Sequence, residues 1–334
     1  MQASGWPRLP DWAQVASIRG FLKAAGKCKK DRAVVGNMRL KLVLLSGILL
    51  PTAVGCALAG RRGPVPAEVA AARDWSQQGV AAAEAGQWDQ AETLLRKSIE
   101  ALPADATSRR YLAEALWRRG AFEDALVQIE AAARTDSNSA DLAVRAGEML
   151  LAAQSFELAT ARADQVICLD PKLASAWALR GRAYWHLSQL ERALADLQHA
   201  LDYAPQDREL LLEIAGVYRQ IGQPTRCLTT LHQLLETYPP GQAPQQVLLQ
   251  QGITLKQLGR GRQAADSLLA ASHAGPPDAQ IHCLLAQVHV SLGEYALATA
   301  AAQQSLAIEP AHAASTELLT QLANRSAPLE PVRR

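Results

Sequence analysis

Small, turn-forming and helix-ending residues recur with a period of 34 residues along most of the chain. Position 8 of every window is Gly or Ala, and position 20 is Ala in six windows and Cys in one. Position 15 is Gly in five windows, and position 32 is Pro in six. The seven windows are 72–105, 106–139, 140–173, 174–207, 208–241, 245–278 and 279–312. A fixed period of this length indicates a repeat architecture.

Each window predicts two helices joined by a turn. Small residues at positions 8 and 20 allow the two helix axes to approach closely, because a large side chain there would hold them apart. Gly at position 15 permits the positive φ of a helix stop, and Pro at position 32 ends the second helix. Large apolar residues at positions 4, 7, 11 and 24, such as Leu116, Tyr184 and Leu197, are expected to fill the seams between helices.

The segments that flank the windows have separate predictions. Residues 313–324 continue the phase as a lone capping helix with a polar outer face, which repeat stacks need at their ends. Residues 325–334 contain two Pro and are expected to fray. Residues 61–71 are expected to form a linker before the first window.

The pattern resembles the tetratricopeptide repeat, whose motif places Trp, Gly, Tyr, Ala and Pro at fixed spacing. The fourth window matches it best, with Trp177, Gly181, Tyr184, Ala193 and Pro205. Departures from the motif are Gln154 and Ser188 in place of the turn Gly, Ser137 in place of Pro, and the absence of Phe at position 24. The resemblance covers residues 72–312. It implies an all-α, right-handed superhelical solenoid of seven 34-residue helix-turn-helix repeats plus a C-terminal capping helix.

Residues 38–60 contain, in order, the basic start and the uncharged apolar run that are typical of a bacterial export signal. Arg39 and Lys41 form a basic start, and the 19 residues from 42 to 60 carry no charge. The run Ala53-Val54-Gly55-Cys56 resembles the bacterial lipobox, although Ala53 stands where that motif prefers Leu. The resemblance implies that Cys56 is lipidated and becomes the mature N-terminus.

Two other interpretations of this segment stay open: an uncleaved anchor, for which 19 uncharged residues are just long enough, and an internal helix of the body. In the lipoprotein and anchor interpretations, the basic flank stays in the cytoplasm and the repeats are exported. The expected location is then the periplasmic side of the bacterial cell envelope, attached to the membrane. A signal that does not function would leave the protein in the cytoplasm.

Residues 1–37 form a basic extension, and residues 1–41 together carry a net charge of +7. One interpretation is that Met38 is the true start of the protein. The other is a real cytoplasmic tail that forms a short amphipathic helix on a membrane surface through Trp6, Trp12, Ile18, Phe21 and Leu22.

Composition and charge exclude several protein classes. Aromatic residues are 5% of the chain and Ala and Leu dominate, which excludes an all-β protein and disfavours a parallel-sheet enzyme. Residues 63–334 carry 23 basic and 30 acidic side chains, and this negative balance disfavours a nucleic-acid partner. Five Cys without a CxxC pair exclude a disulfide scaffold and a zinc ribbon.

The sequence contains no recognisable set of catalytic residues. His282, Cys283 and His289 lie close in sequence, but their spacing matches no zinc pattern, and both His occupy seam positions of the last window. The phosphate-binding, serine-hydrolase and metalloprotease motifs are absent. We therefore expect a non-enzymatic protein with no cofactor and no metal site.

The resemblance implies that positions 2, 5, 9, 12 and 13 of the first helices line a concave binding groove. The expected groove residues are Arg110, Trp117, Arg118, Glu148, Arg182, Trp185 and His186. Trp and Arg are enriched at binding hot spots, whereas rim charges such as Arg219 are expected to matter little. The alternative is that the two Trp pack on neighbouring first helices and the charges are solvated. Position 9 lacks the Asn of the family's carboxylate clamp, so that ligand is not expected.

The sequence thus predicts an interaction scaffold that binds an extended peptide or a partner helix in its groove. It also predicts attachment to a membrane through the N-terminal segment. The first alternative is a structural or assembly subunit of a membrane complex, in which the stack packs laterally. A weaker alternative is the non-catalytic part of a larger enzyme system.

Overall fold

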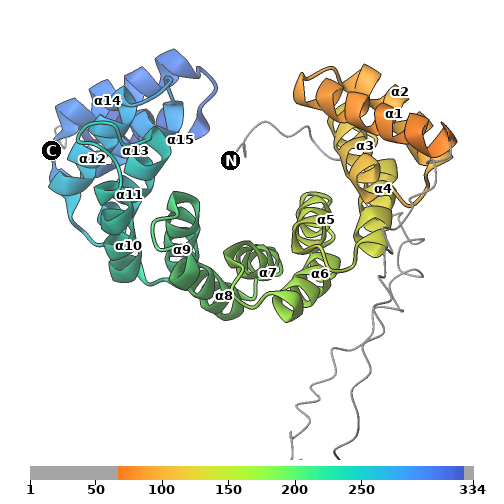
Figure 1. The fold of residues 1–334 in the computed structure, drawn as a ribbon. Helices are drawn as coiled ribbons and strands as arrows, with labels where there is room; N and C mark the ends of the chain where they lie inside the picture. The colour runs from red at the N-terminus through yellow and green to blue at the C-terminus, as the bar shows by residue number, and fades with distance from the viewer. Residues whose placement is uncertain (1–66, 327–334) are drawn as a thin grey trace, which may run out of the picture. The chain divides into compact units, whose positions relative to one another are not determined.

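The computed structural model describes residues 67–326, and these residues form fifteen α-helices with no strand among them (Figure 1). In chain order the helices are α1 Ala67–Glu84, α2 Trp88–Ala101, α3 Ala106–Arg119, α4 Phe122–Thr135, α5 Ala140–Ala152, α6 Phe156–Leu169, α7 Ala174–His186, α8 Leu190–Tyr203, α9 Arg208–Ile221, α10 Pro224–Glu236, α11 Gln245–Gln257, α12 Gly261–His273, α13 Ala279–Leu292, α14 Tyr295–Ile308 and α15 Ala313–Ser326. The prediction of an all-α fold built of helix pairs is confirmed.

The described residues divide into two compact units. Unit 1 runs to Ser155 and contains α1 to α5, and unit 2 begins at Phe156 and contains α6 to α15. The division falls inside the third window, at the turn between its two helices. In unit 2 the first helices α7, α9, α11 and α13 lie along one side and the second helices α8, α10, α12 and α14 along the other (Figure 1). We call these the first-helix side and the second-helix side of unit 2.

In four of the first helices, the residue just before the helix determines where the helix begins. Asp105, Asp207 and Asp278 each accept a hydrogen bond through Oδ1 from a backbone N–H two residues ahead, at 3.0, 2.9 and 2.8 Å. Ser139 does the same for the N–H of Leu142 at 3.3 Å. These side chains satisfy N–H groups that have no partner inside the helix. The preference for Asp or Ser at position 34 therefore sets where four of the first helices begin.

The residue at position 15 ends the first helix of each pair by adopting a positive φ. Gly86, Gly120, Gly222, Gly259 and Gly293 all have positive φ between 70° and 87°. Gln154 and Ser188, which replace Gly at this position, are also forced to a φ of 58°. L-residues pay roughly 1–2 kcal/mol for this conformation, so these two turns carry strain that the glycine turns do not.

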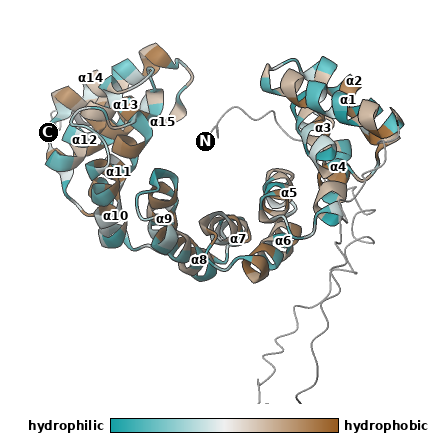
Figure 2. Cartoon of the chain, in the orientation of Figure 1, coloured by the Kyte–Doolittle hydropathy of each residue, from teal (hydrophilic) through white to brown (hydrophobic). Residues whose placement is uncertain are grey.

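Close packing within each pair depends on small residues. A Cβ atom added to Gly79, Gly181 or Gly252 would lie 2.7, 2.9 or 2.6 Å from the Cγ of a leucine on the partner helix, which is Leu95, Leu197 or Leu268. The side chains at position 20 are at most 1% exposed: Ala91, Ala125, Ala159, Ala193, Cys227, Ala264 and Ala298. Each helix also carries polar residues along part of its surface (Figure 2).

Several seam positions hold polar residues instead of apolar ones, and one of these residues joins three helices. Position 7 of the fourth window is Arg180, whose Nε and Nη2 donate to the two carboxylate oxygens of Asp196 at 2.7 and 2.9 Å. Its Nη1 donates to Asp164 Oδ1 at 2.6 Å, and its Cζ lies 4.8 Å from the centre of the Trp177 ring. The two carboxylates raise the pKa of Arg180, so α6, α7 and α8 of unit 2 are tied by a permanent cation.

The boundaries differ from expectation at both ends of the described residues. The linker was expected to extend to residue 71, but α1 begins at Ala67, because Ala67 to Ala72 are mostly strong helix formers. The capping helix α15 extends to Ser326, past the expected residue 324. The predicted signal segment 38–60, with Cys56, and the basic extension 1–37 lie outside the described residues. Among the residues described, no helix is both long and apolar enough to span a bilayer.

We predict that Gly181→Leu lowers the free energy of unfolding by about 1–3 kcal/mol or more, because the new side chain overlaps Leu197 and the backbone oxygen of Ala193. Denaturant unfolding followed by circular dichroism measures the effect. The matched control is Ser175→Leu, which adds the same side chain at an exposed position of α7 and should change stability by less than about 0.5 kcal/mol. Equal midpoints for the two variants would contradict the packing described here.

Candidate functional site

The first-helix side of unit 2 holds two of the expected groove residues next to each other. Arg182 and Trp185 are three residues apart on α7, and both reach across to α9. Residues three apart on a helix are surface neighbours, so this part of the predicted site is assembled by one helix and completed by the next. Trp117 belongs to unit 1.

Arg182 is engaged by two carboxylates. Its Nε donates to Glu213 Oε1 at 2.6 Å, and its Nη2 lies 3.2 Å from Glu209 Oε1. The side chains of Arg182 and Glu213 are 25% and 17% exposed, so this pair is largely shielded from water. A ligand that used Arg182 would have to compete with acids of the protein itself. Arg182 therefore joins α7 to α9 more than it offers a free positive charge.

Trp185 packs on the neighbouring first helix. Its Nε1 donates to Gln220 Oε1 at 2.6 Å, and its ring lies so close to Gly216 that an added Cβ there would be 2.7 Å from Cη2. The ring is half-buried, so one part of it is held by α9 and the remainder faces solvent. Gly216 is the position-9 residue of the fifth window, and its missing side chain makes room for the ring.

Trp117 does not provide an exposed platform, which corrects the sequence expectation. It is 2% exposed, and its ring meets that of Phe122 edge-on at a centroid distance of 4.8 Å. Phe122 is the first residue of α4, so Trp117 fills the turn region of its own helix pair. Trp117 is therefore packed rather than exposed, but against the second helix of its own pair and not against a neighbouring first helix, as the packing alternative had it.

The remaining expected residues have partners within their own units. Glu148 accepts from Arg145 Nη1 at 2.9 Å, and Arg145 also donates from Nη2 to Glu114 at 2.7 Å. Arg118 is exposed, and its Cζ lies 4.4 Å from the centre of the Trp88 ring. Arg110 is exposed beside Tyr111, at 5.1 Å.

His186 is exposed, and its ring stacks on Phe156 at 4.7 Å with an interplanar angle of 3°. It thus lies at the contact of α7 with α6. The stacked rings pack α7 against α6 within unit 2, so His186 has a packing contact rather than a free position on the surface.

Sequence reasoning missed a regular bond between consecutive first helices. Glu114 bonds Arg145 and Arg182 bonds Glu213, and both pairs are 31 residues apart. In the same way, Lys256 Nζ donates to Gln287 Oε1, 31 residues further on. Position 9 of one repeat thus meets position 6 of the next repeat, and position 12 meets position 9 of the next repeat. Opposite charges separated by 31 residues are the signal that would have revealed two of these bonds.

Glu213 has an unusual environment for a carboxylate. Burial raises its pKa to about 7, the bond and charge of Arg182 act in the opposite direction, and the charges of Glu209 and Asp207 raise it further. Its Oε2 is buried and accepts no hydrogen bond. Glu213 is consequently the one described group on this side of unit 2 with a pKa raised into the neutral range.

No group of three His, Cys, Asp or Glu in the described part of the chain is placed to hold a metal ion. His289 Nδ1 lies 2.6 Å from Glu294 Oε2, and Cys283 is 3% exposed. His282, Cys283 and His289 therefore have packing and capping surroundings rather than a shared site.

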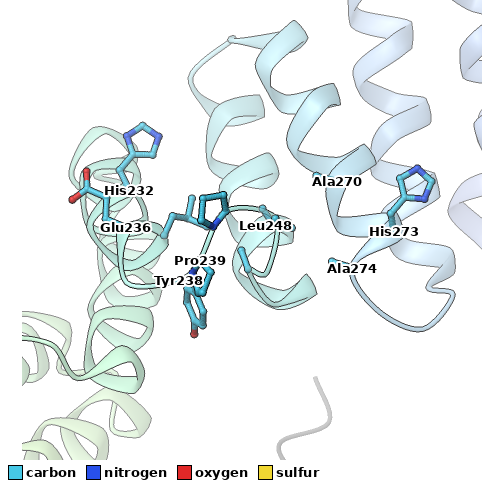
Figure 3. A pocket seen from close by; sticks show the side chains of 12 residues that line it. His232, Glu236, Tyr238, Pro239, Leu248, Ala270, His273 and Ala274 are labelled. Carbon is cyan, nitrogen blue, oxygen red and sulfur yellow. The ribbon is translucent and has the colours of Figure 1, made fainter.

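The second-helix side of unit 2 carries an open hollow of about 1010 Å³ between α10 and α12 (Figure 3). His232 and Glu236 lie on one rim and His273 on the other, with Tyr238, Pro239 and Leu248 between them. The hollow adjoins the insertion 242–244, which lengthens the connection between α10 and α11. Its lining is mostly apolar, and it is wide open to solvent.

Comparison with known proteins identifies the repeat. Two family models, both described as tetratricopeptide repeat, match residues 76–141 and 249–313 in one case and 187–252 in the other. No curated protein sequence matches the chain.

Solved structures show the same fold at low identity. A tetratricopeptide repeat protein from Parabacteroides merdae ATCC 43184 is 15% identical, with a TM-score of 0.56 over 76% of this chain and 100% of that one. YrrB, described as a TPR protein with an unusual peptide-binding site, is 18% identical, with a TM-score of 0.51 over 57% of this chain and 97% of that one. The APC/C hetero-tetramer Cut9-Hcn1 is 15% identical, with a TM-score of 0.56 over 74% of this chain and 48% of that one.

We predict that Glu213 makes unit 2 less stable as the pH rises. The folded state holds the Glu213 proton more tightly than the unfolded state, because its pKa is raised from 4.5 to about 7. Its contribution is therefore fully present below pH 4.5 and is lost as the pH rises through about 7. Between pH 4.5 and 8, the wild-type protein should lose about 1–3 kcal/mol more stability than Glu213→Gln.

Denaturant midpoints of both proteins across this pH range measure the difference. The control is Glu191→Gln, since Glu191 is exposed on α8 and is not among the charges that act on Glu213, so this change should leave the wild-type pH dependence intact. Parallel curves for the wild type and Glu213→Gln would show that Glu213 ionises normally in the folded protein.

Proposed function

We propose that this chain, which is built of tetratricopeptide repeats, is a non-enzymatic protein-binding scaffold that holds an extended peptide segment on the first-helix side of unit 2. Repeats of this class are generally non-catalytic and act by binding other proteins. The peptide-binding site named for YrrB supports the same kind of ligand here.

The observation that carries the proposal is the set of half-buried side chains on adjacent first helices. Contacts such as Trp185 with Gly216 and Lys256 with Gln287 show that positions 12 and 9 point along this side, between one first helix and the next. Leu249, Ile253 and Val290 are half-buried apolar residues at positions 5, 9 and 12 of α11 and α13. Partly exposed apolar residues beside polar groups are typical of a peptide-binding surface.

A strand-like peptide fits this surface better than a small molecule. The described side chains lie on successive parallel helices, so they form a row rather than an enclosed cavity. An extended segment can place alternate side chains along such a row and bind by many modest contacts. The half-exposed Trp185 ring would close one end of the row.

We further propose that residues 38–60 attach the scaffold to the cell envelope and that the repeats face the periplasm. The basic start at Arg39 and Lys41, the uncharged run and the small residues before Cys56 support a lipoprotein signal. A peptide ligand in that compartment would belong to another envelope protein.

The binding surface is tested by site-specific photo-crosslinking in cells that express the full-length protein. A photoreactive residue at Ile253 should form a cross-link to a protein partner, because Ile253 lies in the middle of the proposed surface. The matched control is Leu269 on α12, which is apolar and 50% exposed on a second helix. Cross-links at Leu269 and none at Ile253 would contradict the proposal and favour lateral assembly through the second-helix side.

The membrane attachment is tested by labelling with palmitate. The wild-type protein should incorporate the label and Cys56→Ser should not, because only Cys56 follows the small-residue run. Cys28→Ser removes another cysteine from the N-terminal region and should leave labelling unchanged. An unlabelled wild-type protein that keeps residues 38–55 by mass spectrometry would favour the uncleaved anchor.

A further inference from the structure

The first helices of unit 2 differ in charge from the rest of the unit. Helices α7, α9, α11 and α13 contain five basic residues and two acidic ones, whereas the remaining described residues of unit 2 contain seven basic and thirteen acidic. The two acids are Glu209 and Glu213, and both engage Arg182. Beyond α9, the first helices α11 and α13 contain no Asp or Glu.

Arg219 is a cation that this arrangement leaves without an acid. It is half-buried in the last turns of α9, its Nε is buried and donates no hydrogen bond, and it forms no ion pair with a described residue. Its charge acts on the buried thiol of Cys227, whose Sγ lies 3.3 Å from Thr254 Oγ1 on α11. Arg219 therefore lies near the contact that Cys227 and Thr254 make between α10 and α11.

Lys256 is a second such cation, at the same position 12 of the next repeat. Its Nζ donates to the amide oxygen of Gln287 on α13, which is a neutral acceptor. Burial lowers the pKa of Lys256, the thiol of Cys283 acts in the opposite direction, and no described carboxylate forms an ion pair with Lys256. Lys256 thus also keeps a positive charge that no acid of the protein balances.

The residue at position 9 of α11 explains why Arg219 lacks a partner. Elsewhere on this side, position 12 meets position 9 of the next first helix, as Lys256 meets Gln287 and Trp185 meets Gly216. For Arg219 the corresponding residue is Ile253, whose side chain has no hydrogen-bond acceptor. A partly buried guanidinium without an acceptor is costly, and a ligand carboxylate would satisfy it through charge-assisted bonds.

We propose that Arg219 and Lys256, with Ile253 between them, form a subsite that binds a carboxylate next to an apolar side chain in an acidic segment of the partner protein. The inference rests on the proposed function and names the chemistry of its ligand. It places the acid-binding position not at Arg182, which the protein's own carboxylates engage, but at two cations that form no ion pair with them. It also gives Arg219 a central place, although the sequence alone marks it as a rim charge.

The test uses the full-length protein, purified in detergent, and fluorescence anisotropy. The probe is a fluorescein-labelled peptide of repeated Gly-Leu-Asp triplets with an amidated end, compared with an amidated Gly-Leu-Asn peptide. The Asp peptide should bind at least about tenfold more tightly, since hydrogen bonds between charged groups are worth about 1.5–3 kcal/mol. Arg219→Gln and Lys256→Gln should each weaken its binding by about tenfold.

Arg262→Gln is the matched control, because it removes the same charge from an exposed position of the second helix α12. It should leave the affinity unchanged. A Gly-Leu-Asn peptide with a free terminal carboxylate separates the two carboxylate sources: binding that depends on Arg219 and Lys256 would place the acid at the chain end. Circular dichroism and denaturant midpoints establish that each variant is folded.

Equal binding of the amidated Asp and Asn peptides would overturn the inference, as would Asp-peptide binding that is insensitive to both substitutions in folded protein. A single-stranded oligonucleotide of matching charge that binds more tightly than the Asp peptide would also overturn it. If Ile253 forms cross-links in cells while the acidic probe fails, the scaffold proposal stands and only the carboxylate subsite is wrong. Cross-links confined to Leu269 would instead reject the binding surface itself.

Discussion

The close approach of the two helices in each pair is the constraint on which the rest of the structure depends. At Gly79, Gly181 and Gly252 there is no room for even one more carbon beside the partner leucine. This contact fixes how each first helix is rotated about its axis, and the rotation decides which positions point inward and which point along the first-helix side. The residues at positions 9 and 12 are available to neighbours or ligands because position 8 is held against the second helix.

Contacts between consecutive first helices form the next level of order. These contacts have similar geometry but different chemistry. Arg182 forms an ion pair with Glu213, and the Trp185 ring packs against Gly216. The ammonium group of Lys256 donates to the side-chain amide of Gln287. Each of these stabilises the stack and also consumes a side chain that would otherwise face a ligand. Positions 9 and 12 of the first helices therefore contribute both to the stability of the repeat array and to its capacity to bind a ligand.

This shared use explains what the sequence predicted well and what it did not. Positions 8, 15 and 20 depend on contacts inside one repeat, so the period alone located the helix pairs and their turns. Exposure at position 12 depends on which individual side chains lie beside it, in the second helix of the same repeat and in the next first helix. Trp117 and Trp185 occupy the same position, yet Trp117 is buried against Phe122, whereas the corresponding residue of the fourth repeat is Leu190. The partner of Arg182 likewise lies 31 residues away, in another repeat.

A repeat protein therefore reveals its ligand chemistry most clearly where consecutive repeats fail to match. Where position 9 of the next helix supplies an acceptor or a space, the side chain at position 12 is satisfied by the protein itself. Where it supplies Ile253, a half-buried cation is left with its bonding capacity unused. Because leaving such a group unsatisfied costs free energy in the unbound state, a ligand that supplies the missing acceptor recovers that cost on binding. The mismatch is thus a local weakness of the stack and, for the same physical reason, its best-defined point of recognition.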